Sequence, residues 1–312
     1  MENRMQFSSL DLAPSLEQAL AACGYDTMTP IQQQAIIPAR RGKDLLANAQ
    51  TGTGKTAAFA IPMLQRLLDQ PTATEPNYPK SLILTPTREL GEQLAETIAG
   101  YAQFTELSLV ALYGGVKSSG QAAKLNAGVD IVIATPGRLL EHLVKCTINL
   151  AKVQCVVLDE ADRMLDMGFI ADVTEILAKT NKRRQTLLFS ATISQAVKQL
   201  AGQILQQPQT VSVAKQNATA DTVTHIAYAI DERSKPDLLA ALIETQQWFQ
   251  VLVFTSTKAQ ADTLMSTLNM IKIPAALCHG DKSQGARRRA IADFKSGKVQ
   301  VLVAHEVCAR GL

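Results

Sequence analysis

No segment of this sequence is long and apolar enough to suggest a membrane span. The longest apolar runs, such as residues 155–158, have the length of a strand and fall far below the roughly 18 residues that cross a bilayer. Residues 1–20 alternate polar and apolar side chains and contain no signal-peptide core. We therefore expect a cytoplasmic protein without a membrane partner.

Cysteine pairs and an excess of one charge are also missing. The five cysteines are odd in number and form no C-x-x-C pair, which argues against a disulfide framework and against zinc ligands. Lys and Arg number 31 against 28 Asp and Glu, for a net charge of +3. This balance excludes a uniformly basic surface for nucleic acid but leaves room for a local basic groove.

Short β-rich runs alternate with helical segments along most of the chain. Strands are predicted at 45–48, 81–85, 109–112, 130–134, 154–159 and 185–189, with helices such as 90–102 and 194–205 between them. This alternation is typical of βαβ units, in which helices cover both faces of a parallel sheet. The sequence therefore predicts an α/β fold, and its length suggests about two domains.

The small, polar segment 214–222 is predicted to be a linker. After it, strands are predicted at 225–230, 251–255, 275–277 and 299–304, and helices near 238–245, 259–268 and 284–294. This second unit is short and stops just beyond a predicted strand. Because a parallel sheet needs cover on both faces, we expect the second unit to be incomplete.

A glycine-rich loop follows the first strand and opens a helix. Its residues are Ala49, Gln50, Thr51, Gly52, Thr53, Gly54, Lys55 and Thr56. In such a loop the backbone N–H groups surround phosphate oxygens, Lys55 reaches the β- and γ-phosphates, and the Thr56 hydroxyl ligates Mg²⁺. Ala49 stands where the usual pattern has its first glycine. The strand–loop–helix context favours a nucleotide site over a chance glycine-rich turn.

Acidic residues follow a later buried strand, in the run Asp159-Glu160-Ala161-Asp162. An Asp at a strand end can hold Mg²⁺, and a neighbouring Glu can polarise the attacking water. By itself the run is equally typical of a solvated helix N-terminus, and the phosphate loop upstream favours the metal site. Ser190 and Thr192 end the next strand, where hydroxyl residues usually serve as N-caps.

With these three motifs, the sequence resembles the DEAD-box family of ATP-dependent RNA helicases, of bacterial type, over nearly its whole length. The resemblance implies two RecA-like (P-loop NTPase) domains with parallel sheets, the second of them truncated. The expected divisions are a Q-motif region at 1–34, an ATP-binding domain at 35–213, the linker at 214–222 and a C-terminal helicase domain at 223–312.

Residues 24–32 look like the family's Q motif, and Phe7 lies 17 residues before it. The resemblance implies that Gln32 reads adenine, because an amide offers both a donor and an acceptor. It also implies that Phe7 stacks on the base. ATP, with Mg²⁺, is therefore the expected nucleotide, and another P-loop ATPase such as a DNA helicase is disfavoured.

Further blocks resemble the family's RNA-contacting motifs, and those of the first unit follow strand ends, where ligands bind in open α/β sheets. The residues expected to contact RNA are Pro86, Thr87, Arg88, Gly115, Thr135, Gly137, Arg138, Thr255, Gly280 and Arg287. Hydroxyls, backbone N–H groups and arginine suit sugar-phosphate contacts without base readout. The expected partner is single-stranded or short duplex RNA of any sequence. Asp162, Ser190 and Thr192 are expected to couple this face to the ATP site.

Two departures from the family pattern concern the second unit. His305-Glu306 stands where motif V usually has Thr-Asp, and the 312 residues contain no His-Arg-x-Gly-Arg-x-Gly-Arg motif. In the family that motif supplies an arginine finger, which is worth about 10³–10⁵ in turnover. The resemblance therefore implies an RNA-dependent ATPase that opens short duplexes, with impaired turnover in this chain. The alternative is a non-catalytic fragment or clamp that binds nucleotide and RNA. The sequence identifies no protein partner and no particular RNA.

Overall fold

A computed structural model describes residues 5–71, 73–213 and 224–305. The chain divides into two compact units, Met1–Ala218 and Thr219–Leu312. The predicted linker at 214–222 lies outside the described residues, as does Glu306, so the domain boundaries remain predictions. No helix in the described ranges has the length and hydropathy needed to cross a bilayer.

The first unit is built on a seven-stranded sheet in the order β3-β4-β2-β5-β6-β1-β7, and neighbouring strands run parallel to one another. The strands are β1 (Leu45–Asn48), β2 (Ser81–Leu84), β3 (Leu109–Leu112), β4 (Ile131–Ala134), β5 (Cys155–Leu158), β6 (Gln185–Ser190) and β7 (Gln209–Ser212). The α/β prediction and its six strands are confirmed. Strand β7 was not predicted, because Val211 is its only buried residue and the segment carries little apolar signal.

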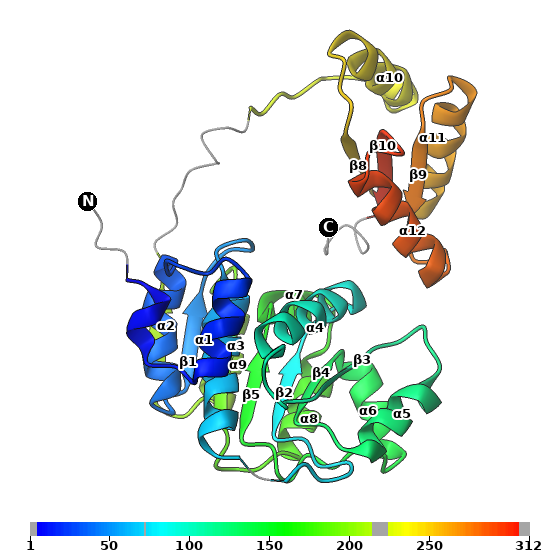
Figure 1. Ribbon diagram of the computed structural model, residues 1–312. Helices are drawn as coiled ribbons and strands as arrows, with labels where there is room; N and C mark the ends of the chain where they lie inside the picture. Colours follow the sequence, from blue (N-terminus) through cyan, green and yellow to red (C-terminus); the bar gives the residue numbers. More distant parts are fainter. Residues whose placement is uncertain (1–4, 72, 214–223, 306–312) are drawn as a thin grey trace. The chain divides into compact units, whose positions relative to one another are not determined.

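Helices cover both faces of this sheet (Figure 1). They are α1 (Pro14–Ala22), α2 (Pro30–Arg40), α3 (Lys55–Asp69), α4 (Arg88–Ala102), α5 (Ser118–Ala127), α6 (Pro136–Val144), α7 (Ala161–Asp166), α8 (Ile170–Ala178) and α9 (Gln195–Ile204), after a 3₁₀ turn η1 (Phe7–Leu10). Helices α1 to α4 contribute to one apolar core, and α5 to α9 contribute to the other. Alternate strand residues enter opposite cores, so that Val157 faces the first and Val156 the second.

The second unit holds a three-stranded parallel sheet in the order β8-β10-β9. Its elements are η2 (Glu232–Ser234), α10 (Lys235–Thr245), β8 (Val251–Thr255), α11 (Lys258–Met270), β9 (Ala275–Cys278), α12 (Gln284–Lys295) and β10 (Val301–His305). The strand predicted at 225–230 is wrong, because these residues form no strand and Ile226 is 65% exposed. Alternation of polar and apolar side chains predicts that one face of a segment is buried. The segment forms a strand only where the backbone of a neighbouring segment pairs with its own backbone.

The order of the strands determines which loops meet at the carboxyl edge of the first sheet, the upper edge of that unit in Figure 1. The loops after β5, β6 and β1 follow strands that are neighbours, and so do the loops after β3, β4 and β2. Strand β5 pairs with both β6 and β2, so Asp159 stands between the two groups of loops.

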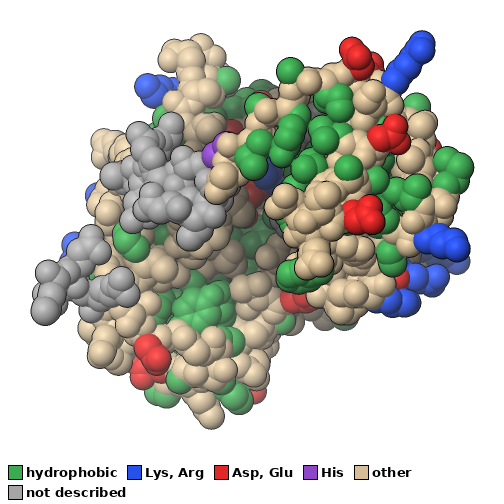
Figure 2. Space-filling view, turned by 90° about the horizontal axis from the view of Figure 1, so that it is seen from above, with side chains coloured by type: hydrophobic (Ala, Val, Ile, Leu, Met, Phe, Trp, Pro, Cys, Tyr) green, Lys and Arg blue, Asp and Glu red, His purple; other side chains and the backbone are tan. Residues whose placement is uncertain are grey.

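Over the face seen in Figure 2, Lys and Arg are interspersed with Asp and Glu and form no continuous basic coat.

Candidate functional site

The glycine-rich loop connects β1 to α3, as its motif predicts. Gly52 and Gly54 have φ angles of +83° and +92°, in the region that favours glycine. The backbone of Ala49 does not have a positive φ, so its methyl group is tolerated where the usual pattern has glycine. Its N–H donates to the carbonyl of Ser190 at 3.0 Å. The loop is therefore anchored at its start to the end of β6.

Gln32 lies directly beneath this loop. Its Oε1 accepts from the N–H of Thr29 at 2.7 Å, and its Nε2 donates to the carbonyl of Gly54 at 3.1 Å. A Cβ atom on Gly54 would overlap the Nε2 of Gln32. The amide thus joins the first turn of α2 to the phosphate loop, a role that the sequence did not indicate. Its expected contact with adenine remains a prediction.

Phe7 is 4% exposed and belongs to the first core. Its ring meets that of Tyr25 edge-on, with centroids 5.7 Å apart, and its N–H donates to the carbonyl of Asp26 at 3.0 Å. The Tyr25 hydroxyl in turn lies 2.7 Å from that of Tyr101 on α4. Phe7 therefore fixes the chain before the Q-motif region, and its stacking on a base remains a prediction.

Lys55 and Asp159 are buried charged residues at this edge, and each has a side-chain atom without a hydrogen-bond partner in the described part of the chain. They are 7% and 5% exposed, and neither Lys55 Nζ nor Asp159 Oδ1 has a hydrogen-bond partner among the described residues. Burial raises the pKa of Asp159 to about 6, with Lys55 opposing the shift and Glu160 adding to it. Because buried polar groups are nearly always paired, these two atoms fit a ligand that carries both phosphate and a cation.

The surroundings of Asp159 also suit a magnesium ion. Its carboxylate and the hydroxyl of Thr56 are oxygen donors, which this cation prefers. The described residues contain no cluster of three or more His, Cys, Asp and Glu side chains able to enclose a metal. A site with few protein ligands is the arrangement in which phosphates and water complete the coordination of magnesium.

Glu160 is held toward the phosphate loop. Its backbone has a φ of +56°, its Oε2 lies 2.7 Å from Nη1 of Arg163, and its Oε1 accepts from the hydroxyl of Thr51 at 3.4 Å. Sequence reasoning missed Arg163, although an acid and a base three residues apart are a signal for such a pair.

The three residues expected to couple the site are in contact. The N–H and the hydroxyl of Thr192 both donate to Oδ2 of Asp162 at 2.9 Å, and the Ser190 hydroxyl donates to the carbonyl of Thr192 at 2.7 Å. The N-cap of α9 is instead Ser194, whose side chain accepts from the N–H of Val197. Ser190 and Thr192 therefore do not serve as helix caps, and their coupling role stays a prediction.

Arg88, on the opposite half of the edge, holds the loop after β3. Its Nη1 donates to the carbonyl of Gly114 at 2.9 Å, its Nε pairs with Glu92 at 2.9 Å, and its guanidinium lies 4.6 Å from the ring centre of Tyr113. Only 8% of Arg88 is exposed. Gly115 has a φ of +78°, and a Cβ atom there would lie 2.7 Å from Arg88 Nη1. The guanidinium thus shapes this loop and is not presented to solvent.

Arg138 reaches the same loop from α6. Its Nη1 donates to the carbonyl of Val116 at 3.0 Å and to Oε1 of Gln121 at 2.9 Å. Thr135 is the N-cap residue of α6, and Gly137 in the first turn is exposed. The groups left for a ligand are therefore backbone N–H groups at a helix start, which suit phosphate. Pro86 and Thr87 are buried, and Thr87 caps α4 by accepting from the N–H of Leu90 at 3.3 Å.

The expected RNA residues of the second unit gather at the carboxyl edge of its own sheet. Thr255 ends β8, and its hydroxyl donates to the carbonyl of Thr257 at 3.1 Å. His305, one of the two unusual residues of motif V, ends β10 beside Thr255 in the parallel register. Gly280 follows β9, and Arg287 is half-buried in the first turns of α12. Their contact with RNA remains a prediction.

Two family models match the chain. The model for DEAD/DEAH box helicases covers residues 29–200, and that for the helicase conserved C-terminal domain covers residues 234–312. The chain is 40% identical to the ATP-dependent RNA helicase RhlB of Pseudomonas aeruginosa, over 100% of this chain and 80% of the relative. It is 37% identical to the DEAD-box ATP-dependent RNA helicase CshA of Bacillus cereus, over 98% of this chain and 57% of the relative.

A solved structure of an RNA-bound relative has a similar fold. A variant of S. cerevisiae Dbp5 bound to RNA and ADP BeF3 superposes with a TM-score of 0.86 at 29% identity, covering 98% of this chain and 77% of that one.

Proposed function

Since the chain belongs to the DEAD/DEAH box helicase family, we propose that it is an ATP-dependent RNA helicase. One observation carries this proposal. A buried ammonium, Lys55, and a buried carboxylate, Asp159, belong to or follow the loops of this edge, and Lys55 Nζ and Asp159 Oδ1 have no hydrogen-bond partner among the described residues. A nucleotide triphosphate with magnesium supplies the missing partner of each. The similarity to relatives named as ATP-dependent RNA helicases supports the same proposal.

Each residue of the site has a role in this reading. Lys55 binds the β- and γ-phosphates, and Thr56 and Asp159 hold the magnesium. Magnesium held by these residues would supply positive charge against the phosphates. Glu160 orients the attacking water, with its carboxylate kept in place by Arg163.

A line of hydrogen bonds leads away from the nucleotide site. It runs from the N–H of Ala49 to the carbonyl of Ser190, from the Ser190 hydroxyl to Thr192, and from Thr192 to Asp162. Asp162 is two residues from the water-orienting Glu160. We infer that a change in the phosphates bound at the loop alters these contacts, and so alters the strand ends that would hold RNA.

RNA is proposed to bind through its backbone. Arg88 and Arg138 hold the 113–116 loop through its carbonyls, which leaves hydroxyls and backbone N–H groups to meet sugars and phosphates. Contacts of this kind carry no base identity, so binding is expected to be independent of sequence. Local opening of a short duplex follows when the bound strand is held in a shape that a duplex does not accept.

A second function, a clamp that binds nucleotide and RNA without turnover, is favoured by a specific feature of the sequence. His305-Glu306 stands where motif V of the family usually has Thr-Asp, which removes a hydroxyl expected at the RNA face of the second unit. Lys55 and Asp159 would still bind the nucleotide.

The experiment that tests these proposals measures ATP binding and ATP hydrolysis at low salt, with and without single-stranded RNA. Lys55→Ala serves as the blank, and Lys124→Ala, a change at an exposed lysine on α5, as the matched control. We expect the wild type and Lys124→Ala to bind ATP and Lys55→Ala not to bind it. RNA-stimulated hydrolysis above the blank identifies a helicase, and binding without hydrolysis identifies the clamp. Equal ATP affinity in wild type and Lys55→Ala would refute both.

A further inference from the structure

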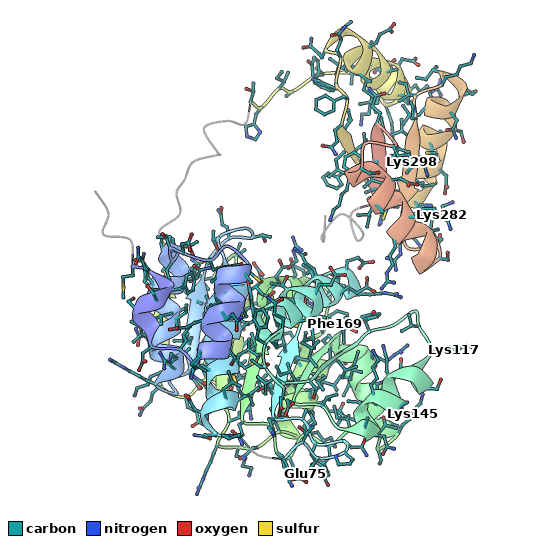
Figure 3. The ribbon with its side chains drawn as sticks, in the orientation of Figure 1. Glu75, Lys117, Lys145, Phe169, Lys282 and Lys298 are labelled. Carbon is teal, nitrogen blue, oxygen red and sulfur yellow. The ribbon has the colours of Figure 1, made fainter. Side chains whose placement is uncertain are left out.

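A polar cavity lies at the opposite edge of the first sheet from the phosphate loop, where β1, β6 and β7 begin. Its volume is about 480 Å³. In Figure 3 the lower edge of this unit, which holds the strand starts, is marked by Glu75, shortly before β2. Four cationic side chains line the cavity, Lys43, Arg66, Arg183 and Arg184, against one carboxylate, Asp44. The lining includes no aromatic residue.

Asp44 does not neutralise these cations through ion pairs. It is 6% exposed, and its two oxygens accept from the backbone N–H groups of Thr186 at 2.8 Å and Gln206 at 2.7 Å. Its hydrogen bonds join the starts of β6 and β7 to the start of β1. The cavity therefore keeps an excess of positive charge within the described part of the chain.

The arginines are partly committed to the fold. Arg66 donates to Oε1 of Gln185 at 3.2 Å, and Arg184 Nη1 donates to the carbonyls of Leu177 and Asn181 at 3.4 Å each. Carbonyls at a helix end attract cations, which accounts for part of this clustering. It does not account for Nε of Arg184, which is buried without a hydrogen-bond partner among the described residues.

Lys43 and Arg183 are exposed and have no side-chain hydrogen bond or ion pair with any other described residue. Burial holds the pKa of Arg184 below its usual value, with Asp44 opposing the shift. Because Asp44 offsets only part of the desolvation of Arg184, an anion beside this cation would relieve the remaining penalty.

We propose that this cavity binds phosphate groups, either of a free polyphosphate or of an RNA backbone. Several cations around one cavity match an anion with more than one charge and several acceptor oxygens, and arginine suits such oxygens through paired N–H groups. The volume is in the range of small-ligand sites. Because nothing aromatic lines it, it offers no surface on which a base stacks. The cavity lies at the edge opposite Lys55, so this inference does not depend on the helicase function.

The test uses inorganic tripolyphosphate as the probe, titrated calorimetrically at low salt into a Lys55→Ala chain, in which the phosphate loop does not compete. Lys43→Gln with Arg183→Gln removes two cavity charges. Lys124→Gln with Lys198→Gln removes two charges at exposed positions on α5 and α9. We expect the cavity variant to lose about tenfold in affinity, and the control variant less than about twofold, because charge-assisted contacts are strong and remote exposed charges are screened.

The same variants titrated with single-stranded RNA distinguish the two sources. A parallel loss of RNA affinity assigns the RNA backbone, and unchanged RNA affinity assigns free polyphosphate. Equal tripolyphosphate affinity in the cavity and control variants overturns the inference. So does a polyglutamate peptide that binds the cavity more tightly than tripolyphosphate does. Thermal unfolding checks that both variants fold, and Arg183→Gln alone replaces the pair if the double change unfolds the chain. ATP binding by the chain with Lys55 intact is measured separately, so a failure of the proposed function stays distinguishable.

Discussion

Replacing Gly54 by alanine tests how the phosphate loop is held. Two independent features of this position oppose a side chain. The φ angle is +92°, and a Cβ atom would overlap the amide of Gln32, which is 1% exposed. To make room, that amide must leave its hydrogen bonds to the N–H of Thr29 and the carbonyl of Gly54. Gly54→Ala therefore destabilises the protein even before any nucleotide binds.

The magnitude follows from these two features. A non-glycine residue in the left-handed region costs about 1 kcal/mol. Loss of two buried hydrogen bonds adds about 2 kcal/mol. In a unit of this size each kcal/mol lowers the unfolding temperature by about 2–4 °C. We expect the nucleotide-free Gly54→Ala chain to unfold about 6–12 °C below the wild type, measured by circular dichroism or differential scanning fluorimetry.

Gly52→Ala is the matched control, because Gly52 has a φ of +83° and no atom within 4 Å of the Cβ position. It carries the backbone cost alone and should lower the unfolding temperature by about 2–4 °C. In a Gln32→Ala background the amide is gone, and Gly54→Ala should then cost only about 1 kcal/mol. Equal shifts for Gly52→Ala and Gly54→Ala, or full additivity with Gln32→Ala, would refute this reasoning.

Three further changes have expected outcomes. Burial raises the pKa of Asp159 to about 6, so its ionised form weakens the nucleotide-free fold above pH 6. Asp159→Asn should therefore raise the free energy of unfolding by about 3 kcal/mol at pH 8. This gain should vanish as the pH falls from 6 to 4, as measured by denaturant titrations. Lys80 lies 2.8 Å from the buried Asp130. Lys80→Met should lower the free energy of unfolding by about 3 kcal/mol, because it leaves a buried carboxylate without its ion pair, and adding Asp130→Asn should recover part of that loss. Thr192→Val removes a hydroxyl that donates to Asp162; it should leave ATP affinity within about twofold and lower RNA stimulation or RNA affinity by about tenfold.

Much of the site was predictable because its signals are local. A phosphate loop needs glycine at positions of positive φ, and Gly52 and Gly54 have it. Acidic residues directly after a buried apolar run must emerge at the end of a strand, as Asp159 does after β5. Alternation of strands and helices likewise predicts a parallel sheet with a core on each face, and both cores are present.

Partners of side chains were harder to predict, since they come from distant segments. Arg88 and Arg138 match motifs that in the family touch RNA, yet they bind carbonyls of the 113–116 loop. Gln32 binds the loop carbonyl of Gly54, 22 residues away. Segment 225–230 has the alternation of a strand but pairs with none of the strands in the described ranges. Such outcomes depend on which backbone lies next to a residue, and periodicity carries no information about that.

The sequence by itself specifies an α/β architecture, a phosphate loop and acidic residues at the end of a later strand. Each of these signals depends on only a few neighbouring residues: the period of a strand, the positions of glycines, or carboxylates directly after an apolar run. Folding adds the rest. It buries Lys55 Nζ and Asp159 Oδ1 at one edge of the sheet, with no hydrogen-bond partner for either atom in the described ranges. At the other edge it collects Lys43, Arg66 and Arg183 from segments far apart in the sequence. A cavity of that kind exists only once the sheet order brings the starts of β1, β6 and β7 together.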